Sequence, residues 1–269
     1  MSHFDVKFLD KNGERYMLSN RVRQLLSALK SKYLIADRFE TGDFMFRDGQ
    51  YTFADRDKGE WVPFKAKTDY WGYPECYCWF KQTVTIPKSF KGKHVIYNVT
   101  PYTYQGWLDT TNPQLIFFVN GKCVQGGDRN HRYFTVTESA KGGEKLEIYI
   151  NAHADAREFK REINMSAALE VYDDIAADIY YDIATPLEVA GFYDCDDTRR
   201  VNLVNTLNEA CNLLDIDSGD VESFHKSAKK AKAYLNKNLC GKFGEETAWC
   251  VGHTHIDVAW LWRLRQTRE

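Results

Sequence analysis

The sequence predicts a mainly β protein with added helices: an antiparallel β-sandwich that follows an N-terminal helix and precedes a helical segment. Two observations carry this prediction. From about residue 44 to residue 171, short apolar and aromatic runs alternate with turn residues, which is typical of antiparallel sandwiches. On either side of that span, apolar residues recur every three or four positions, as they do in helices that bury one face.

The first expected element is an amphipathic helix that runs from Gly13 to about Asp37. Its apolar positions fall at three- and four-residue spacings: Leu18, Val22, Leu25, Leu26 and Leu29. A helix with a single apolar stripe needs a surface to cover. We therefore expect residues 1–43 to form a helical arm that packs on the β-sandwich next to it in the chain.

The β-sandwich is expected over residues 44–171. Its strand-like runs are "CYCWFKQTVTIP", "KHVIYNVT", "QLIFFVNGKCVQGG", "HRYFTVTES" and "EKLEIYINAH". The strongest local signal is Asn120-Gly121, because both central residues of a type I′ turn need a positive φ, which Asn and Gly tolerate best. The turn predicts a hairpin between "LIFFV" and "KCVQG". The overall pattern of this region resembles that of galactose-binding-like jelly rolls.

A compact helical segment is expected over residues 172–245. Two sets of apolar residues each recur at helical spacing and predict one helix apiece. The first set is Ile175, Ile179 and Ile183, and the second is Val201, Val204, Leu207, Cys211 and Leu214. A third helix is expected in "VESFHKSAKKAKAYLNKNL". Asp197 and Ser218 are placed as N-caps, and Gly241 as a stop. Most of the carboxylates of "DDIAADIYYD" and "YDCDD" are expected on solvated faces.

The composition excludes several classes of protein. The 269 residues carry a net charge of −2, with 43% hydrophobic and 28% charged residues, so neither a nucleic-acid partner nor a membrane partner is indicated. No apolar run approaches the roughly 18 residues that a membrane span needs, and the N-terminus lacks the continuous apolar core of a signal peptide. We expect a cytoplasmic protein.

The cysteines favour free thiols. There are seven of them, an odd number at irregular spacings, and Cys76, Cys78 and Cys123 fall inside strand-like runs where a thiol packs as a small apolar group. A reducing compartment is the simpler explanation. The "CYC" segment is not expected to bind zinc, because no second Cys or His pair follows at the spacing of a structural zinc site.

The candidate chemistry lies in "ETAWCVGHTHID". Ala248 to Val251 is expected to form one short buried strand that runs into a loop at Gly252. If the backbone stays extended, His253, His255 and Asp257 project from one face, because successive side chains alternate. Imidazole and carboxylate suit zinc and its neighbours, but two ligands do not hold an ion well. On spacing alone, a hydrogen-bonded histidine pair near a helix cap remains the alternative.

The segment "GHTHIDVAWLWRLRQTRE" resembles the motif that opens the catalytic domain of glycoside hydrolase family 38 α-mannosidases, in particular the cytosolic and bacterial branch. The upstream order of helix, sandwich and helices is similar to that branch as well. The resemblance implies that residues 246–269 begin an α/β catalytic domain with its first strand. It also implies a chain that stops just inside that domain.

By this resemblance His255 and Asp257 are zinc ligands, or ligands of another divalent cation, and Trp260 is the aromatic wall of the mannose subsite. His253 is expected to orient a ligand or touch a sugar hydroxyl without binding the ion. A further Asp that doubles as the nucleophile, a further His and a separate acid/base carboxylate lie, by this resemblance, in the remainder of the family's catalytic domain. No catalytic residue is therefore expected in these 269 residues. The implied activity is that of a retaining, metal-dependent α-mannosidase acting on mannose-containing oligosaccharides, and the chain alone is expected to be inactive.

The alternative is a carbohydrate-binding or scaffold sandwich without catalysis of its own. Exposed tryptophans can stack on sugar rings, and the sandwich carries Trp61, Trp71, Trp79 and Trp107. Trp79 is expected in the core, whereas Trp71 and Trp107 are loop candidates for a sugar contact. A scaffold role is favoured. The "GGDRNHR" segment, with Asp128 and His131, is explained by turn chemistry and left outside the site.

Overall fold

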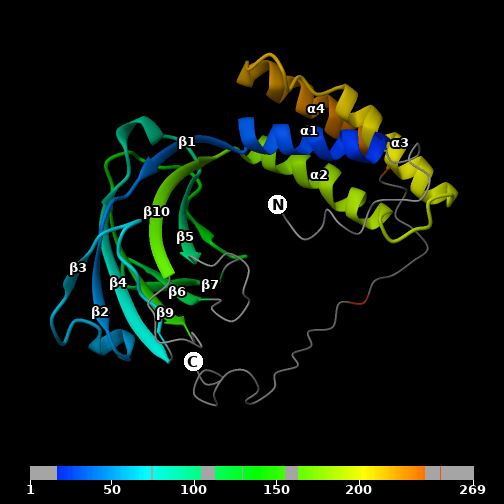
Figure 1. Cartoon of the computed structure of the whole chain (residues 1–269). Coiled ribbons are helices and arrows are strands. Elements are labelled where there is room, and N and C mark those ends of the chain that lie inside the picture. Colours follow the sequence, from blue (N-terminus) through cyan, green and yellow to red (C-terminus); the bar gives the residue numbers. More distant parts are fainter. Residues whose placement is uncertain are drawn as a thin grey trace.

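The computed structural model describes residues 17–73, 75–103, 113–128, 130–154, 163–239 and 249. They form a β-sandwich and, beside it, a group of four helices (Figure 1). The sequence-based prediction of antiparallel sheets with added helices is confirmed. The strand expected at residues 248–251 lies outside the described residues, except for Trp249.

Two sheets make up the sandwich, and every strand pairing within them is antiparallel. The four-stranded sheet has the order β1 (Ile35–Glu40), β10 (Ile163–Tyr172), β5 (Val95–Thr103), β8 (Tyr133–Thr137). The six-stranded sheet has the order β3 (Val62–Phe64), β2 (Phe44–Asp48), β4 (Cys76–Thr85), β9 (Lys145–Ala154), β6 (Gln114–Val119), β7 (Lys122–Gly127).

The core of the sandwich follows from the alternation of side chains along the strands. In β4, Cys76, Cys78 and Phe80 face the other sheet and are fully buried. In β9, Ile148, Ile150 and Ala152 do the same from the neighbouring strand. Side chains at the intervening positions lie on the outer face of the six-stranded sheet.

The predicted hairpin is confirmed. β6 and β7 pair from Val119–Lys122 outwards, and the two turn residues have the positive φ that the turn type requires, 48° at Asn120 and 83° at Gly121. Asn120 also ties the turn to β9, because its backbone N–H donates to the Glu147 carbonyl at 2.8 Å and its side chain accepts from the Glu147 N–H at 2.9 Å.

The N-terminal helix ends earlier than expected, and a strand comes after it. α1 spans Met17–Tyr33, and β1 pairs with β10 where the sequence predicted the end of the helix and the rest of the helical arm. β1 is an edge strand in which five of the six residues are exposed. It therefore lacks the apolar alternation by which the other strands were predicted.

α1 does not form an arm on the sandwich. It packs among α2 (Asp174–Ala190), α3 (Thr198–Asn212) and α4 (Val221–Asn238), with which it shares one apolar core (Figure 1). Tyr33 stacks on Phe224 of α4 with ring centroids 3.9 Å apart and an interplanar angle of 5°. Val22 and Leu29 are fully buried as the spacing predicted, whereas Leu18 is exposed.

One of the two expected N-caps is confirmed and the other is displaced. Asp197 caps α3, since its carboxylate accepts from the Arg199 N–H at 2.8 Å. α4 is capped by Asp220, which accepts from the N–H groups of Glu222 and Ser223, and Ser218 accepts from the Asp220 N–H just before the helix. A carboxylate two residues nearer the helix reaches the unpaired N–H groups that Ser218 cannot. Gly241 lies outside the described residues.

The remaining global expectations concern cysteines, carboxylates and membrane spans. The described cysteines are free thiols: Cys76, Cys78, Cys123, Cys195 and Cys211. Asp174 and Asp178 lie on solvated helix surface as expected, with side chains 68% and 67% exposed. Within the described ranges, no helix combines the length and the apolar character needed to cross a membrane.

Candidate functional site

The residues predicted to bind metal and mannose are not among those the structure describes. His253, His255, Asp257 and Trp260 all lie beyond residue 249, and Trp107 falls in the gap between residues 103 and 113. In the described part of the chain, no group of three or more His, Cys, Asp or Glu side chains is arranged to hold a metal ion.

Trp61, Trp71 and Trp79 make contacts within the fold, whereas Trp249 is 87% exposed. Trp71 was a loop candidate for a sugar contact, but its side chain is fully buried in the sandwich core, with its ring centroid 5.4 Å from that of Phe80, so this candidate is excluded. Its backbone forms an isolated bridge to Ile163, which draws the loop into the core. Trp79 is 2% exposed, as expected for a core residue. Trp61 donates its indole N–H to Asp57 at 3.1 Å.

The candidate site lies instead on the outer face of the six-stranded sheet, where the strand register places side chains in rows. One row contains Tyr77, His153 and Gln114, from β4, β9 and β6. The next row runs from β2 to β7 through Arg47, Trp79, Asn151, Ile116 and Gly126. A third row contains Lys81, Tyr149 and Phe118.

Part of this face is covered by the segment from residue 51 to residue 61. Phe53 stacks on Phe118 with centroids 4.3 Å apart, and the Arg56 guanidinium lies 3.7 Å from the Phe53 ring centre and 4.3 Å from that of Tyr149. Arg47 holds the segment from beneath, donating to the carbonyls of residues 55, 56 and 58. We call this the covered half: Arg47, Trp79, Lys81, Phe118 and Tyr149.

Lys81, in the covered half, is paired with two carboxylates. Lys81 lies 3.6 Å from an Asp57 carboxylate oxygen and 3.8 Å from one of Glu147. A hydrogen bond with Tyr149 and these two carboxylates raise the pKa of Lys81 above its ordinary value, against the opposing effect of burial. This network fastens the segment to the sheet.

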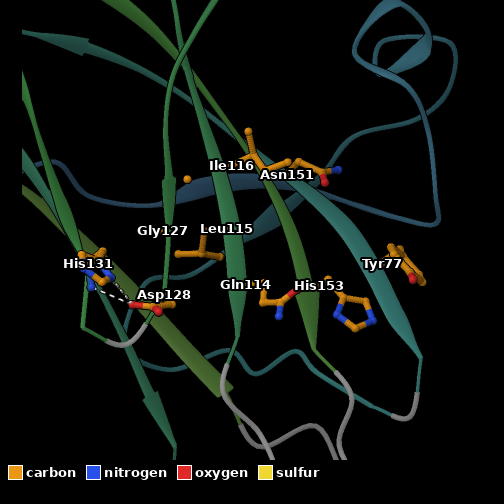
Figure 2. Close-up of a pocket in the computed structure, with 10 residues that line it drawn as sticks. Tyr77, Gln114, Leu115, Ile116, Gly127, Asp128, His131, Asn151 and His153 are labelled. Atoms are coloured by element: carbon orange, nitrogen blue, oxygen red, sulfur yellow. Dashed lines mark hydrogen bonds and ion pairs between the residues drawn. The ribbon is translucent and has the colours of Figure 1, made fainter. Parts of the chain in front are cut away.

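The opposite corner of the same face is open and hollow. We call it the open corner: Tyr77, Gln114, Ile116, Gly126, Asn151 and His153. It bounds a cavity of about 320 Å³ whose far wall is the turn after β7 (Figure 2). The Tyr77 and His153 rings pack with centroids 4.4 Å apart at 46° on one side, and Gln114 lies between them and Asp128.

The turn that closes the cavity is held by Asp128. Its carboxylate accepts from the backbone N–H groups of Asn130 and His131, both at 2.7 Å, and contacts the His131 ring nitrogen Nδ1 at 3.0 Å. Burial alone would raise the pKa of Asp128, but these hydrogen bonds outweigh it and lower the pKa below its ordinary value. The turn chemistry expected from the sequence is therefore present, and Asp128 and His131 also line the cavity.

A second cavity, of about 270 Å³, adjoins the first. The two share Tyr77, Ile116 and Asn151, and the second extends towards Gln50 and Phe53 at the margin of the covered half. Sequence reasoning missed this site. The available signal was the presence of Gln114, Asn151 and His153 at outward positions of strands that are otherwise rich in apolar residues.

Comparisons with known proteins point to one family. The model described as "Alpha-mannosidase, jelly roll domain" matches residues 43–179. Alpha-mannosidase G of Dictyostelium discoideum is 24% identical over 215 residues, covering 71% of this chain and 18% of that protein. Alpha-mannosidase 2C1 of Homo sapiens is 22% identical over 207 residues, covering 71% of this chain and 19% of that protein.

The alignments with these relatives span under a fifth of their length. Among solved structures, a β-glucuronidase of Faecalibacterium prausnitzii resembles 51% of this chain over 32% of its own, at 10% identity and a TM-score of 0.35. That likeness is too distant to carry a functional argument.

Proposed function

The chain belongs to the α-mannosidase jelly-roll domain family, and on this premise we propose that it is the N-terminal part of a retaining, metal-dependent enzyme that hydrolyses α-mannosides. The observation that carries the proposal is the family match over residues 43–179, reinforced by the "GHTHIDVAWLW" segment after the helices. Mannose-containing oligosaccharides are the proposed substrates.

In the proposed enzyme, His255 and Asp257 bind zinc or another divalent cation, Trp260 forms a wall of the mannose subsite, and His253 orients a ligand or a sugar hydroxyl. Imidazole and carboxylate donors fit zinc, but open catalytic zinc sites use about three protein ligands. The two donors here therefore need partners from the remainder of the catalytic domain. When bound, the ion supplies positive charge to the hydroxyls of the mannose ring.

Cleavage in a retaining glycosidase needs a nucleophile and an acid/base carboxylate. We assign neither to these 269 residues, because the aligned relatives are more than five times as long as the parts that match. Residues 246–269 begin the catalytic domain in this proposal, and the sandwich and helices serve as its scaffold. We also propose a cytoplasmic location, which the free thiols of the described cysteines support.

The test compares two lengths of chain on an aryl α-mannoside. The 269-residue chain is expected to release no product. A chain extended to the length of the aligned relatives is expected to release product, and this hydrolysis should stop when a chelator removes the metal. Chelator-insensitive hydrolysis by the 269-residue chain would contradict the proposed metal dependence. It would also contradict the proposal that the nucleophile and the acid/base carboxylate are not among these residues.

Variants of the extended chain test the residue roles. His255→Ala and Asp257→Ala are expected to lower kcat/KM by more than about a hundredfold and to lower the bound metal measured by elemental analysis, whereas His253→Ala costs about 10- to 100-fold. Trp260→Ala raises KM more than it lowers kcat. Asp217→Ala is the matched control, because the Asp217 side chain is 99% exposed on the helical segment. Full metal content in both ligand variants would refute the assignment.

A further inference from the structure

The cavity at the open corner has a polar but nearly uncharged lining. Its polar side chains are two amides, two imidazoles, a phenol and the Asp128 carboxylate, which already accepts three hydrogen bonds within its own turn. Among the described residues that line it, there is no lysine or arginine. An anion would lack a cationic partner here, and a cation would meet only a carboxylate that is already engaged. The lining favours a neutral ligand.

The two amides supply matched donors and acceptors. Gln114 and Asn151 lie in adjacent rows on neighbouring strands, and both line the cavity. The structure records no hydrogen bond between either side-chain amide and another described residue. An amide can accept from one hydroxyl and donate to the next, so the pair is suited to a ligand that carries several hydroxyl groups.

The cavity also offers surfaces for an apolar face. Ile116 lies on its floor, and the Tyr77 ring, packed against His153, forms one side (Figure 2). Sugars combine an edge of hydroxyl groups with a face of C–H bonds, and ligand pockets of this kind join apolar walls to a few placed polar groups. Because the second cavity shares Tyr77, Ile116 and Asn151, the surface continues beyond one ring-sized space.

Gly126 keeps the cavity open. It pairs with Ile116 in the row that forms the floor, so a side chain there would project over the outer face. A Cβ built on Gly126 meets nothing closer than the Leu115 carbonyl oxygen, at 3.9 Å. The backbone would therefore accept a larger residue, and that residue would occupy the space above Ile116.

We propose that the open corner binds a neutral oligosaccharide, at a non-catalytic site separate from the proposed metal centre. The amides of Gln114 and Asn151 hydrogen-bond its hydroxyl groups, and Tyr77 and Ile116 contact its C–H face. This site differs from the tryptophan positions considered from the sequence, of which Trp71 is buried in the core. The proposal does not depend on the proposed function.

The first experiment is an NMR titration of the 269-residue chain with mannotriose, maltotriose and lactose, one at a time. At least one of them is expected to bind with a Kd in roughly the millimolar range or tighter and to shift the side-chain amide signals of Gln114 and Asn151. Binding should persist in the presence of a chelator, which separates this site from the metal centre. If no probe shifts these signals at concentrations up to about 20 mM, the proposal is wrong.

The second experiment uses variants at the cavity and matched controls. Gly126→Leu fills the space and Asn151→Ala removes one amide, and each is expected to weaken binding about tenfold or more. Val124→Leu and Thr83→Ala are the controls, because both positions are exposed in the same sheet and neither lines the cavity. Thermal unfolding verifies that each variant folds. If Gly126→Leu does not fold, the affinity of Asn151→Ala tests the proposal. Unchanged affinity in Asn151→Ala, or an equal loss in the controls, would overturn the proposal.

Discussion

The inner and outer faces of the six-stranded sheet are built from the same strands but are completed in different ways. Cys78 and Phe80, on the inner face of β4, are fully buried against the second sheet. On the outer face, Trp79 is buried only because the segment of residues 51–61 lies over it, and Tyr77, two residues away, borders a cavity. Alternation thus assigns a side chain to a face, whereas what covers that face decides whether it stabilises the fold or can meet a ligand.

The largest effect is expected on the inner face. Phe80 is fully buried and its ring lies 5.2 to 5.8 Å from the rings of Phe44, Phe46, Phe64 and Trp71. Phe80→Ala is expected to lower the free energy of unfolding by about 3 to 5 kcal/mol, measured by urea denaturation.

Thr83→Ala is the control for this variant, because Thr83 is an exposed residue of the same strand, and it should change the stability by less than about 0.5 kcal/mol. If the two variants were equally stable, the inner face would not be the main source of stability in this sheet.

The second prediction compares neighbouring glycines that face opposite ways. A Cβ on Gly127 would lie 2.3 Å from Cε2 of Phe117, a ring that is fully buried and cannot move aside. Gly127→Ala should therefore cost about 1 to 3 kcal/mol of stability, whereas Gly126→Ala should stay within about 0.5 kcal/mol. Differential scanning calorimetry would measure both. A larger cost at Gly126 would reverse the assignment of the two faces.

A smaller effect is expected where the outer face is covered. Phe53→Ala removes the ring that stacks on Phe118 and should cost about 1 to 2 kcal/mol. It should also loosen the cover above Trp79, whose indole N–H donates to the Tyr51 carbonyl at 3.1 Å. Faster hydrogen exchange of the Trp79 indole proton would show that the covering segment has loosened. Phe192→Ala serves as the control, because Phe192 is 90% exposed, and should leave this exchange rate unchanged.

The smallest effect concerns the turn beside the open corner. Because the folded-state pKa of Asp128 is lowered, its carboxylate stabilises the fold above the ordinary Asp pKa near 4, and this contribution is lost as the pH falls through the folded-state value. Asp128→Asn should lower stability at pH 6 by about 0.5 kcal/mol or less. The difference from the unsubstituted chain should disappear once the pH falls below the folded-state pKa of Asp128. A difference that persisted there would show that the carboxylate charge is not its source.

Several elements could be predicted from local sequence because local chemistry determines them. Asn120 and Gly121 form the hairpin because few other residues accept two successive positive φ angles. The apolar spacing of α1 and α2 predicted helices with buried Val22, Leu29 and Ile183. The edge strand β1 could not be predicted in this way, because an exposed strand carries no apolar alternation and is defined only by its pairing with β10.

The candidate site divides along the same line. The sequence alone supplied the motif with His253, His255 and Asp257, which resembles that of α-mannosidases. The family match over residues 43–179 supports this resemblance at the level of the family. Their roles remain predictions, because these residues lie outside the described ranges. The open corner could not be predicted, since Tyr77, Gln114, Gly126 and Asn151 come from four strands that only the sheet register brings together.

By itself, the sequence determined the order of helix, sandwich and helices and the face on which most strand residues lie, because both depend on spacings of two to four residues along the chain. The tertiary structure alone decided that α1 packs with α2, α3 and α4 from the other end of the described chain, that Trp71 is buried, and that the outer face is covered at one end and open at the other. Those outcomes depend on which distant surfaces meet, and burial is set by that meeting and not by local spacing.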